Sequence, residues 1–237
     1  ADVIFYPDMS YNIDEKQGDD HFNCPVVAYY PQVVRWNIPD IKNVKFICDF
    51  LSLAKPKVFE RRIKEILGKY FPEKDFTTKQ ISLATKAAYA EYTEYLESVR
   101  AEGERYIKKA KETGKPVILL AGRPYHVDPE INHGIHELIC RFGAIVLSED
   151  SIRPGKEKLV TGVRNQWTYH SRMYNAAKFV ANAPENLDIH VVQLVSFGCG
   201  VDAVTTDEVR SIVEKSGRLY AQVKIDEISN TGAVTIR

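Results

Sequence analysis

The sequence IHVVQLVSFGCGVDAVTTD, residues Ile189–Asp207, decides the fold predicted for the second half of the chain. The apolar run Val191–Val195 predicts a buried strand, which ends at the Gly-Cys-Gly turn Gly198–Gly200. A helix is expected to begin near Thr205–Thr206, with one of these threonines as its N-cap. Cys199 is thereby placed in the loop at the carboxyl end of a strand, where open α/β sheets bind ligands.

Two interpretations of Cys199 follow from this placement. Gly198 and Gly200 permit unusual backbone angles and close approach to a ligand, and a helix start supplies unpaired N–H groups. A thiolate in that setting is stabilised and is a natural ligand for a soft metal. Alternatively, Cys199 is a small residue that packs in an ordinary strand–helix turn.

Composition limits the class of protein. The chain has 237 residues, of which 44% are hydrophobic and 27% charged, and this predicts one large or two small globular domains. A formal net charge of zero predicts no binding to nucleic acid or to an anionic membrane surface. No apolar stretch reaches the roughly 18 residues of a membrane span, and no signal peptide is recognised. The abrupt first and last residues suggest a piece of a longer protein.

The four cysteines are widely spaced and form no Cys-x-x-Cys pair. This spacing argues against a disulfide framework or a zinc ribbon, and it predicts a reducing, cytoplasmic location. Cys24 precedes Pro25 at the expected start of a helix capped by Asn23, where the helix dipole stabilises a thiolate. The alternative for Cys24 is a buried structural thiol, and Cys48 is interpreted as a core residue.

Strands and helices are expected to alternate along the chain. Predicted strands are Asp2–Tyr6, Asn43–Cys48, Val117–Ala121, Ala144–Leu147, His190–Val195 and Tyr220–Ile225. Predicted helices, after the one beginning at Pro25, are Lys57–Tyr70, Thr77–Thr113 with Gly103 as its only break, Pro129–Phe142, Leu159–Val180 and Thr206–Lys215. The pattern predicts an α/β fold of two Rossmann-like lobes with mostly parallel sheets, joined by long helices. The expected division is a partial first lobe over residues 1–75, a connecting helix over 76–114 and a doubly wound second lobe over 115–237.

Polar side chains follow the predicted strands of the second lobe, at one edge of its sheet. They are Arg123, Tyr125, His126, Cys199, Asp202, Asp226 and Glu227. His126 is either functional, because strand-end loops carry chemistry, or simply buried, and the last two carboxylates are interpreted as a loop pair. His133, His136 and Cys140 fall on one face of a predicted helix and are interpreted as structural rather than as a metal site. No Walker A loop, Gly-x-Gly-x-x-Gly fingerprint or Ser-His motif occurs.

Four long runs carry a family resemblance. They are HFNCPVVAYYP (His21–Pro31), LLAGRPYHVDPEINHGI (Leu119–Ile135), QLVSFGCGVDAVTTDEVR (Gln193–Arg210) and KIDEISNTGA (Lys224–Ala233). Together they resemble the activase-related proteins of the 2-hydroxyacyl-CoA dehydratase group. The resemblance implies that the chain is the dehydratase-like C-terminal portion of a CoA-substrate-specific enzyme activase. It also implies a preceding ATPase module of the acetate/sugar kinase and Hsp70-like class.

The same resemblance implies a [4Fe–4S] cluster held between Rossmann-like lobes by cysteines of strand-end loops. Cys24 and Cys199 match two of the metal-ligand positions, whereas Asp8 stands where the family has a cysteine. Iron–sulfur clusters usually need about four ligands, so the chain supplies at most two of the expected thiolates. Residues expected to bind the cofactor are Arg123, Tyr125, His126, Gly198 and Gly200.

The expected function is therefore an iron–sulfur electron-transfer or reductase portion of an ATP-dependent activase system, with a CoA-thioester enzyme as a further partner. No complete active site is expected in this chain. One alternative is a cluster-free module that binds a small molecule or acyl-CoA through the loops Arg123–His126 and Gly198–Gly200. A second alternative is a docking lobe for the ATPase module, and a homodimer is compatible with each of the three.

Overall fold

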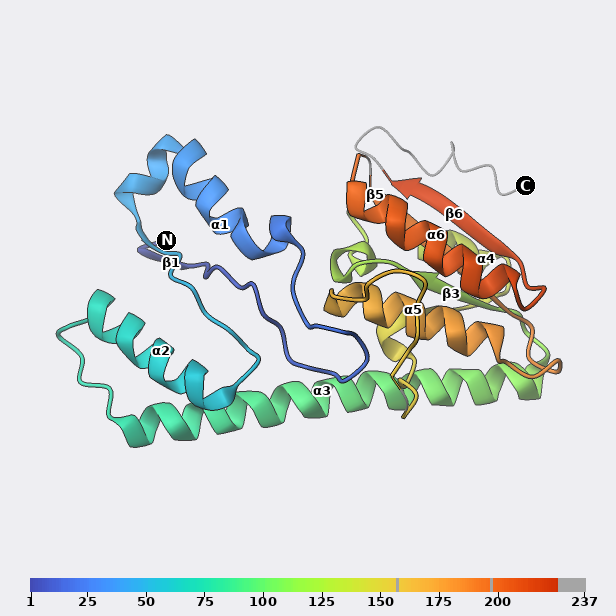
Figure 1. The fold of residues 1–237 in the computed structure, drawn as a ribbon, viewed down its shortest axis with the longest axis horizontal. Helices are drawn as coiled ribbons and strands as arrows, with labels where there is room; N and C mark the ends of the chain where they lie inside the picture. Colours follow the sequence, from blue (N-terminus) through green and yellow to red (C-terminus); the bar gives the residue numbers. More distant parts are fainter. Residues whose placement is uncertain (157, 197, 226–237) are drawn as a thin grey trace. The chain divides into compact units, whose positions relative to one another are not determined.

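The structure is a computed structural model that describes residues 1–156, 158–196 and 198–225 (Figure 1). The chain divides into two compact units, here named the N-terminal unit and the C-terminal unit. The N-terminal unit is Ala1–Tyr95 with Gln166–Thr168, and the C-terminal unit is Leu96–Asn165 with the chain from Tyr169 onward. Asp226 and Glu227 lie outside the described residues, as does most of the run KIDEISNTGA. The three-part division expected from the sequence stays a prediction.

The N-terminal unit is built on a β–α–β crossover. Strands β1 (Val3–Phe5) and β2 (Lys45–Ile47) pair in parallel, and α1 (Pro25–Asn37) connects them, followed by the 3-10 helix η1 (Pro39–Asn43). Pro25 occupies the first turn of α1, where its missing N–H removes no helical hydrogen bond. In such a crossover the helix begins at the carboxyl edge of the sheet, so the start of α1 lies there.

The prediction that β1 is a buried strand is wrong. Val3 and Phe5 are 37% and 50% exposed, because the described sheet of this unit has only two strands and covers little of β1. The core of the unit lies instead between β2 and α2 (Pro56–Tyr70), where Ile47 packs with Ile66. The predicted helix Lys57–Tyr70 agrees with α2 to within one residue.

Helix α3 (Thr78–Thr113) begins in the N-terminal unit and ends in the C-terminal unit, and it is uninterrupted. The sequence predicts a break at Gly103, and the structure shows none. A Cβ atom on Gly103 would lie 2.2 Å from the backbone oxygen of Ser151. The glycine therefore serves close packing of the helix on the 3-10 turn η3 (Glu149–Ser151).

The C-terminal unit contains a four-stranded sheet in the order β4-β3-β5-β6, with every neighbouring pair parallel. Its strands are β3 (Val117–Ala121), β4 (Ile145–Ser148), β5 (Ile189–Ser196) and β6 (Tyr220–Ile225). The α/β class and the parallel sheets are thus confirmed, while a pair of Rossmann-like lobes stays a prediction. The described part of the chain contains no helix that combines the length and the apolar character of a membrane span.

Helices cover both faces of this sheet. On one face α4 (Ile135–Arg141) packs through Ile135 and Ile139 against Leu120 of β3. On the other face lie α5 (Thr168–Ala181), α6 (Gly200–Glu214) and the last turns of α3, which enclose the alternate β3 residues. The chain adds β4 on one side of β3 and then β5 and β6 on the other side. Such a reversal of strand order is a topological switch point, and it opens a crevice between the loops that follow β3 and β5.

Two predicted helices begin too early. The helix expected over Pro129–Phe142 is shortened to α4, because His133 adopts a positive φ of 53° and the Asn132 side chain holds the preceding turn by donating to the His126 carbonyl oxygen. The proposed common helix face of His133, His136 and Cys140 is therefore wrong. The helix expected from Leu159 begins only with α5, nine residues later in the chain.

Candidate functional site

The loops that follow β3 and β5 form the candidate site at the switch point of the C-terminal sheet. Gly198 has a φ of +64°, a left-handed conformation that turns the chain sharply after β5. Cys199 then becomes the N-cap of α6, and it is half-buried. The sequence prediction that α6 begins near Thr205–Thr206 is wrong. The hydroxyls of both threonines donate to carbonyl oxygens one turn earlier, inside the helix.

A buried ion pair joins the two loops. Arg123, which follows β3, and Asp202, in the first turn of α6, are 5% and 6% exposed. Both terminal nitrogens of the guanidinium donate to the carboxylate, at 3.2 Å and 2.5 Å. This two-point contact fixes the orientation of the guanidinium plane. The carboxylate also accepts a hydrogen bond of 2.9 Å from the backbone N–H of Ser196, so it ties the end of β5 to the same pair.

The fixed guanidinium contacts the candidate thiol. Arg123 Nη2 donates to Cys199 Sγ at 3.1 Å, and Nη1 donates to the Tyr125 hydroxyl at 2.9 Å. Burial lowers the pKa of Arg123, but Tyr125, Asp202 and Cys199, when ionised, raise it by more than burial lowers it. The pKa of Arg123 therefore lies above its usual range. Arg123 therefore stays charged. The thiol of Cys199 thus lies beside an immobile cation at the N-terminus of a helix.

His126 is buried and held as a neutral donor. Its Nδ1 accepts the backbone N–H of Arg123 at 3.0 Å, which leaves the proton on Nε2, 3.1 Å from the Ser196 hydroxyl. Burial, and after it the charge of Arg123, lower the pKa of His126 to about 4. With its proton on Nε2, His126 donates to Ser196 and does not act as its base. The arrangement is therefore unlike that of a serine hydrolase.

Gly122 makes room for this histidine. A Cβ atom at Gly122 would lie 2.4 Å from His126 Nδ1, so no larger residue fits without moving the ring. The Gly122 N–H points to another buried group, the carboxyl of Glu149, at 3.3 Å. Burial, and then the charge of Asp150, raise the pKa of Glu149 to about 8, so this carboxyl is protonated at neutral pH.

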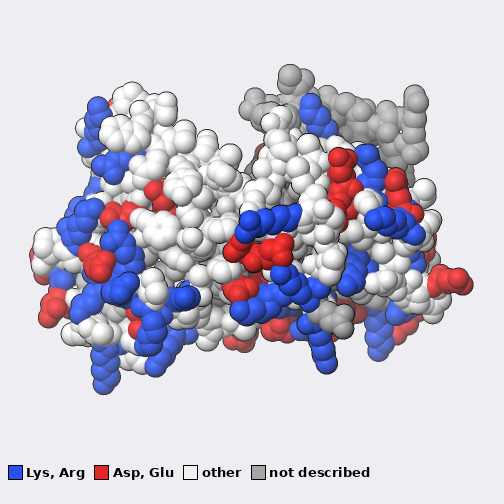
Figure 2. Space-filling view, in the orientation of Figure 1, with Lys and Arg blue, Asp and Glu red and all other residues white. Residues whose placement is uncertain are grey.

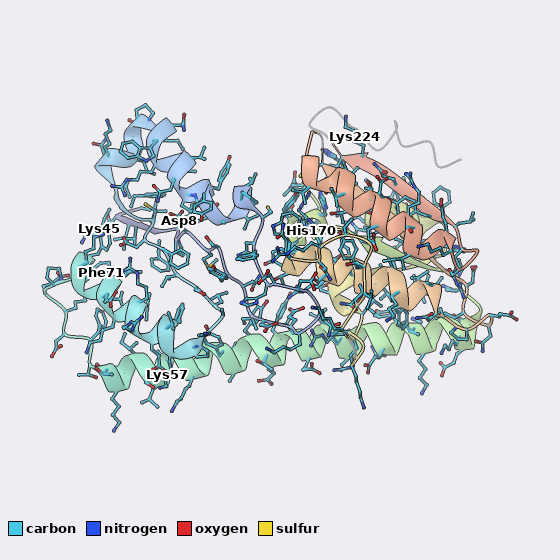
Figure 3. The ribbon with its side chains drawn as sticks, in the orientation of Figure 1. Asp8, Lys45, Lys57, Phe71, His170 and Lys224 are labelled. Carbon is cyan, nitrogen blue, oxygen red and sulfur yellow. The ribbon has the colours of Figure 1, made fainter. Side chains whose placement is uncertain are left out.

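Sequence reasoning missed three members of this site, of which Glu149 and His170 are buried and Ser196 is half-buried. Ser196 is the last residue of β5 and contacts both Tyr125 and His126. Glu149 follows β4, and an acidic residue at the carboxyl end of a strand was a signal that could have identified it. His170, labelled in Figure 3, is buried in α5, and burial followed by the charge of Arg123 lowers its pKa to about 4.

In the N-terminal unit, Cys24 is the N-cap of α1 and is half-buried. The prediction that Asn23 caps this helix is wrong. The Asn23 side chain instead donates to the Met9 carbonyl oxygen at 2.8 Å and accepts from the Asn12 amide at 3.1 Å. These contacts hold the segment before α1, so that the thiol of Cys24 stands at the start of the helix.

Asp8 and Cys48 follow β1 and β2, at the carboxyl edge of this two-stranded sheet. Asp8, labelled in Figure 3, is 7% exposed, and its Oδ2 accepts from Gln32 of α1 at 2.6 Å. Within the described residues its Oδ1 has no hydrogen-bond partner. Cys48 is buried, as predicted. It nevertheless has one charged neighbour, because Arg35 Nη1 donates to its sulfur at 3.2 Å.

The donor set fits an iron–sulfur cluster only in part. Over residues 1–156, 158–196 and 198–225, no group of three or more His, Cys, Asp or Glu side chains is arranged to hold a metal ion. Each unit does present one half-buried thiol at a helix N-terminus, and this is suitable chemistry for iron. Neither unit alone supplies the roughly four ligands that a cluster usually needs.

A comparison with protein families gives one match. The family model described as "CoA enzyme activase uncharacterised domain" (DUF2229) matches residues 1–152, well over half of the chain. The match includes Cys24 and the loop with Arg123 and His126, and it ends before Cys199. Neither the curated proteins nor the solved structures include a protein that matches the chain.

Proposed function

The chain belongs to the family of CoA enzyme activase uncharacterised domains, and we propose that it contributes thiolate ligands to an iron–sulfur cluster of an activase system. The proposed role is electron transfer, as the iron–sulfur or reductase portion of that system. An ATPase module of the acetate/sugar kinase and Hsp70-like class is the proposed source of energy, and a CoA-thioester enzyme is the proposed electron acceptor.

One observation carries this proposal. Cys24 and Cys199, the cysteines that resemble cluster ligands, both occupy the N-cap position of a helix, and both remain half-buried. The other two cysteines do not share this position. Cys48 is buried under Arg35, and Cys140 lies exposed within α4. The two candidate thiols thus have a common structural setting in separate units, which supports a common chemical role.

Arg123 supports the same role for Cys199. Hydrogen bonds to sulfur ligands tune the reduction potential of iron–sulfur clusters. The guanidinium is held against Cys199 by its two-point contact with Asp202, so the donor is already oriented before any ligand binds. A bound [4Fe–4S] cluster would supply one-electron transfer, and the remaining ligands would come from other parts of the protein, a partner or a second copy.

Metal content tests the proposal directly. Full-length protein is purified without oxygen, and its iron and acid-labile sulfide, visible absorbance and EPR signal after reduction are measured. Cys24→Ser and Cys199→Ser are each expected to remove the absorbance shoulder and the EPR signal. Cys140→Ser is the control, because it removes a thiol that lies at neither helix N-terminus. This variant is expected to keep both the absorbance shoulder and the EPR signal. Normal clusters in both test variants would overturn the assignment.

A cluster-free binding module is the second candidate, because the Arg123 network also forms a polar anchor for a small anionic ligand. The guanidinium, the Tyr125 hydroxyl and the Ser196 hydroxyl converge at the crevice of the switch point. This candidate predicts that metal-free protein is stabilised against heat by an acyl-CoA or a nucleotide, and that Arg123→Lys lowers the shift. No stabilisation by any of these compounds would count against it.

A further inference from the structure

A basic groove lies in the C-terminal unit, apart from the Cys199 site. It has a volume of about 730 Å³ and is lined by the last turns of α3, by α5, and by the segments that follow η3 and α5. Its cationic side chains are Lys108, Lys111, Arg153, Lys156 and Lys178, and Glu104 is the one carboxylate among the described residues of the lining. The groove therefore favours an anion.

The floor of the groove is apolar. Ile107 and Phe179 are partly buried and pack on the main core of the unit, and Leu187 belongs to that core. A flat apolar group placed in the groove would cover these side chains while the lysines at the rim stay near water. The combination of an apolar floor with cationic edges is suited to a molecule that carries both a ring system and phosphates.

The lysines, more than the arginine, are available to an incoming anion. Arg153 is held by Glu104 at 2.7 Å and by Glu97 at 2.8 Å. Lys108 lies 3.8 Å from Glu112. Among the residues that the structure describes, no ion pair involves Lys111, Lys156 or Lys178. Figure 2 shows the charged face along α3, where lysine and arginine side chains gather with acidic ones among them.

We propose that this groove binds a nucleoside diphosphate, with the pyrophosphate at the lysines and the base on the apolar floor. A volume of about 730 Å³ falls within the range of roughly 300–1,000 Å³ that is usual for sites of small molecules and cofactors. Lysine is a common phosphate ligand that acts as a point charge. The net charge of zero for the whole chain argues against a nucleic acid, which needs an extended basic surface.

Equilibrium binding of ADP to the full chain tests the proposal, with adenosine and inorganic pyrophosphate as the matched partial ligands. ADP is expected to bind more tightly than either one, because only ADP engages both the rim and the floor. Lys111→Gln and Lys178→Gln are each expected to weaken ADP binding by about tenfold, the effect of losing one charged hydrogen bond. Lys109→Gln changes the same charge on the same helix, outside the lining, and is expected to leave ADP binding unchanged.

The following outcomes would overturn the proposal. ADP binding that is absent, or that Lys109→Gln weakens as much as Lys111→Gln, would rule out this groove. Pyrophosphate that binds as tightly as ADP would show a simple anion site with no place for the base. The salt dependence of binding is a further check. Raising the salt concentration from about 0.1 M to about 1 M shortens the Debye length from roughly 10 to 3 Å, so it should weaken the binding of ADP far more than that of adenosine, and equal weakening of both would contradict the proposal. These measurements need no iron, so they are independent of the electron-transfer proposal.

Discussion

Each unit of the molecule places an arginine beside a cysteine, and the two pairs are built in opposite ways. In the N-terminal unit Cys48 is 3% exposed, whereas Arg35, which donates to its sulfur, is exposed. In the C-terminal unit the donor Arg123 is buried and fixed by Asp202, while Cys199 is half-buried. The contact itself is therefore no sign of function. The pair at Cys199 differs because its cation is fixed in place and its sulfur is accessible to a ligand.

Removing the anchor of the buried arginine should have the largest effect. Asp202→Ala leaves the charge of Arg123 buried without its carboxylate, which is expected to destabilise the C-terminal unit by about 3–5 kcal/mol. Arg35→Gln, in the exposed pair, is expected to cost less than about 1 kcal/mol. Denaturant unfolding followed by circular dichroism measures both, and equal losses in the two variants would contradict the contrast.

The pH dependence of stability should come next, because the C-terminal site holds His126 neutral. The pKa of His126 is about 4 in the folded chain and near 6.5 when unfolded, so the unfolded state binds the proton first. The contribution of His126 to stability is therefore complete above about pH 6.5 and is lost as the pH falls towards 4, by on the order of 3 kcal/mol.

His126→Asn should reduce that loss without abolishing it, because His170 has the same lowered pKa. The free energy of unfolding is measured from pH 8 to pH 4.5 for both proteins. At pH 8 both carry a neutral side chain, so the difference there reports lost contacts alone. A variant whose stability falls with acid as steeply as that of the natural chain would refute the assignment.

Two helical glycines provide a smaller test of the two units. Gly103→Ala in α3 would place its Cβ 2.2 Å from the Ser151 oxygen, and it is expected to cost about 1–3 kcal/mol. Gly68→Ala in α2 meets no atom within 4 Å and is expected to stabilise by roughly 0.5–1 kcal/mol, because alanine is the better helix former. Thermal unfolding should show changes of opposite sign.

The smallest expected effect is the difference in access to the two thiols. In metal-free protein, Cys199 is expected to react with a thiol reagent at least about tenfold faster than Cys48, because the latter reacts only after local opening. Mass spectrometry of partially labelled protein measures both rates at once. Equal rates would show that burial does not separate the two pairs.

Much of the C-terminal sheet was predictable from the sequence. The apolar run that forms β3 ends at Gly122, and the run that forms β6 ends before Asp226; both strands match the prediction to the residue. The clustering of Arg123, Tyr125, His126, Cys199 and Asp202 at one edge followed from parallel strands alone, because their carboxyl ends share an edge.

The errors arose where tertiary contacts override local signals. Thr205–Thr206 resembles a helix cap, yet α6 begins at Gly200, because Asp202 is needed in its first turn to bind Arg123 and the Ser196 N–H. The early start predicted for α4 failed because Asn132 bonds the His126 carbonyl oxygen. Arg123 and Asp202 are 79 residues apart, so their contact cannot be inferred from a local pattern.

The Arg123–Asp202 pair also bears on the order of assembly during synthesis. Its members are 79 residues apart, and they meet only after β5 has paired with β3. Contacts of such long range form late, and chains folding during translation complete their N-terminal parts first. A nascent chain that has released β3 but not yet β5 and α6 therefore exposes the Arg123 guanidinium with neither Asp202 nor Cys199 beside it. The cationic setting of Cys199 is acquired only when this half of the molecule closes.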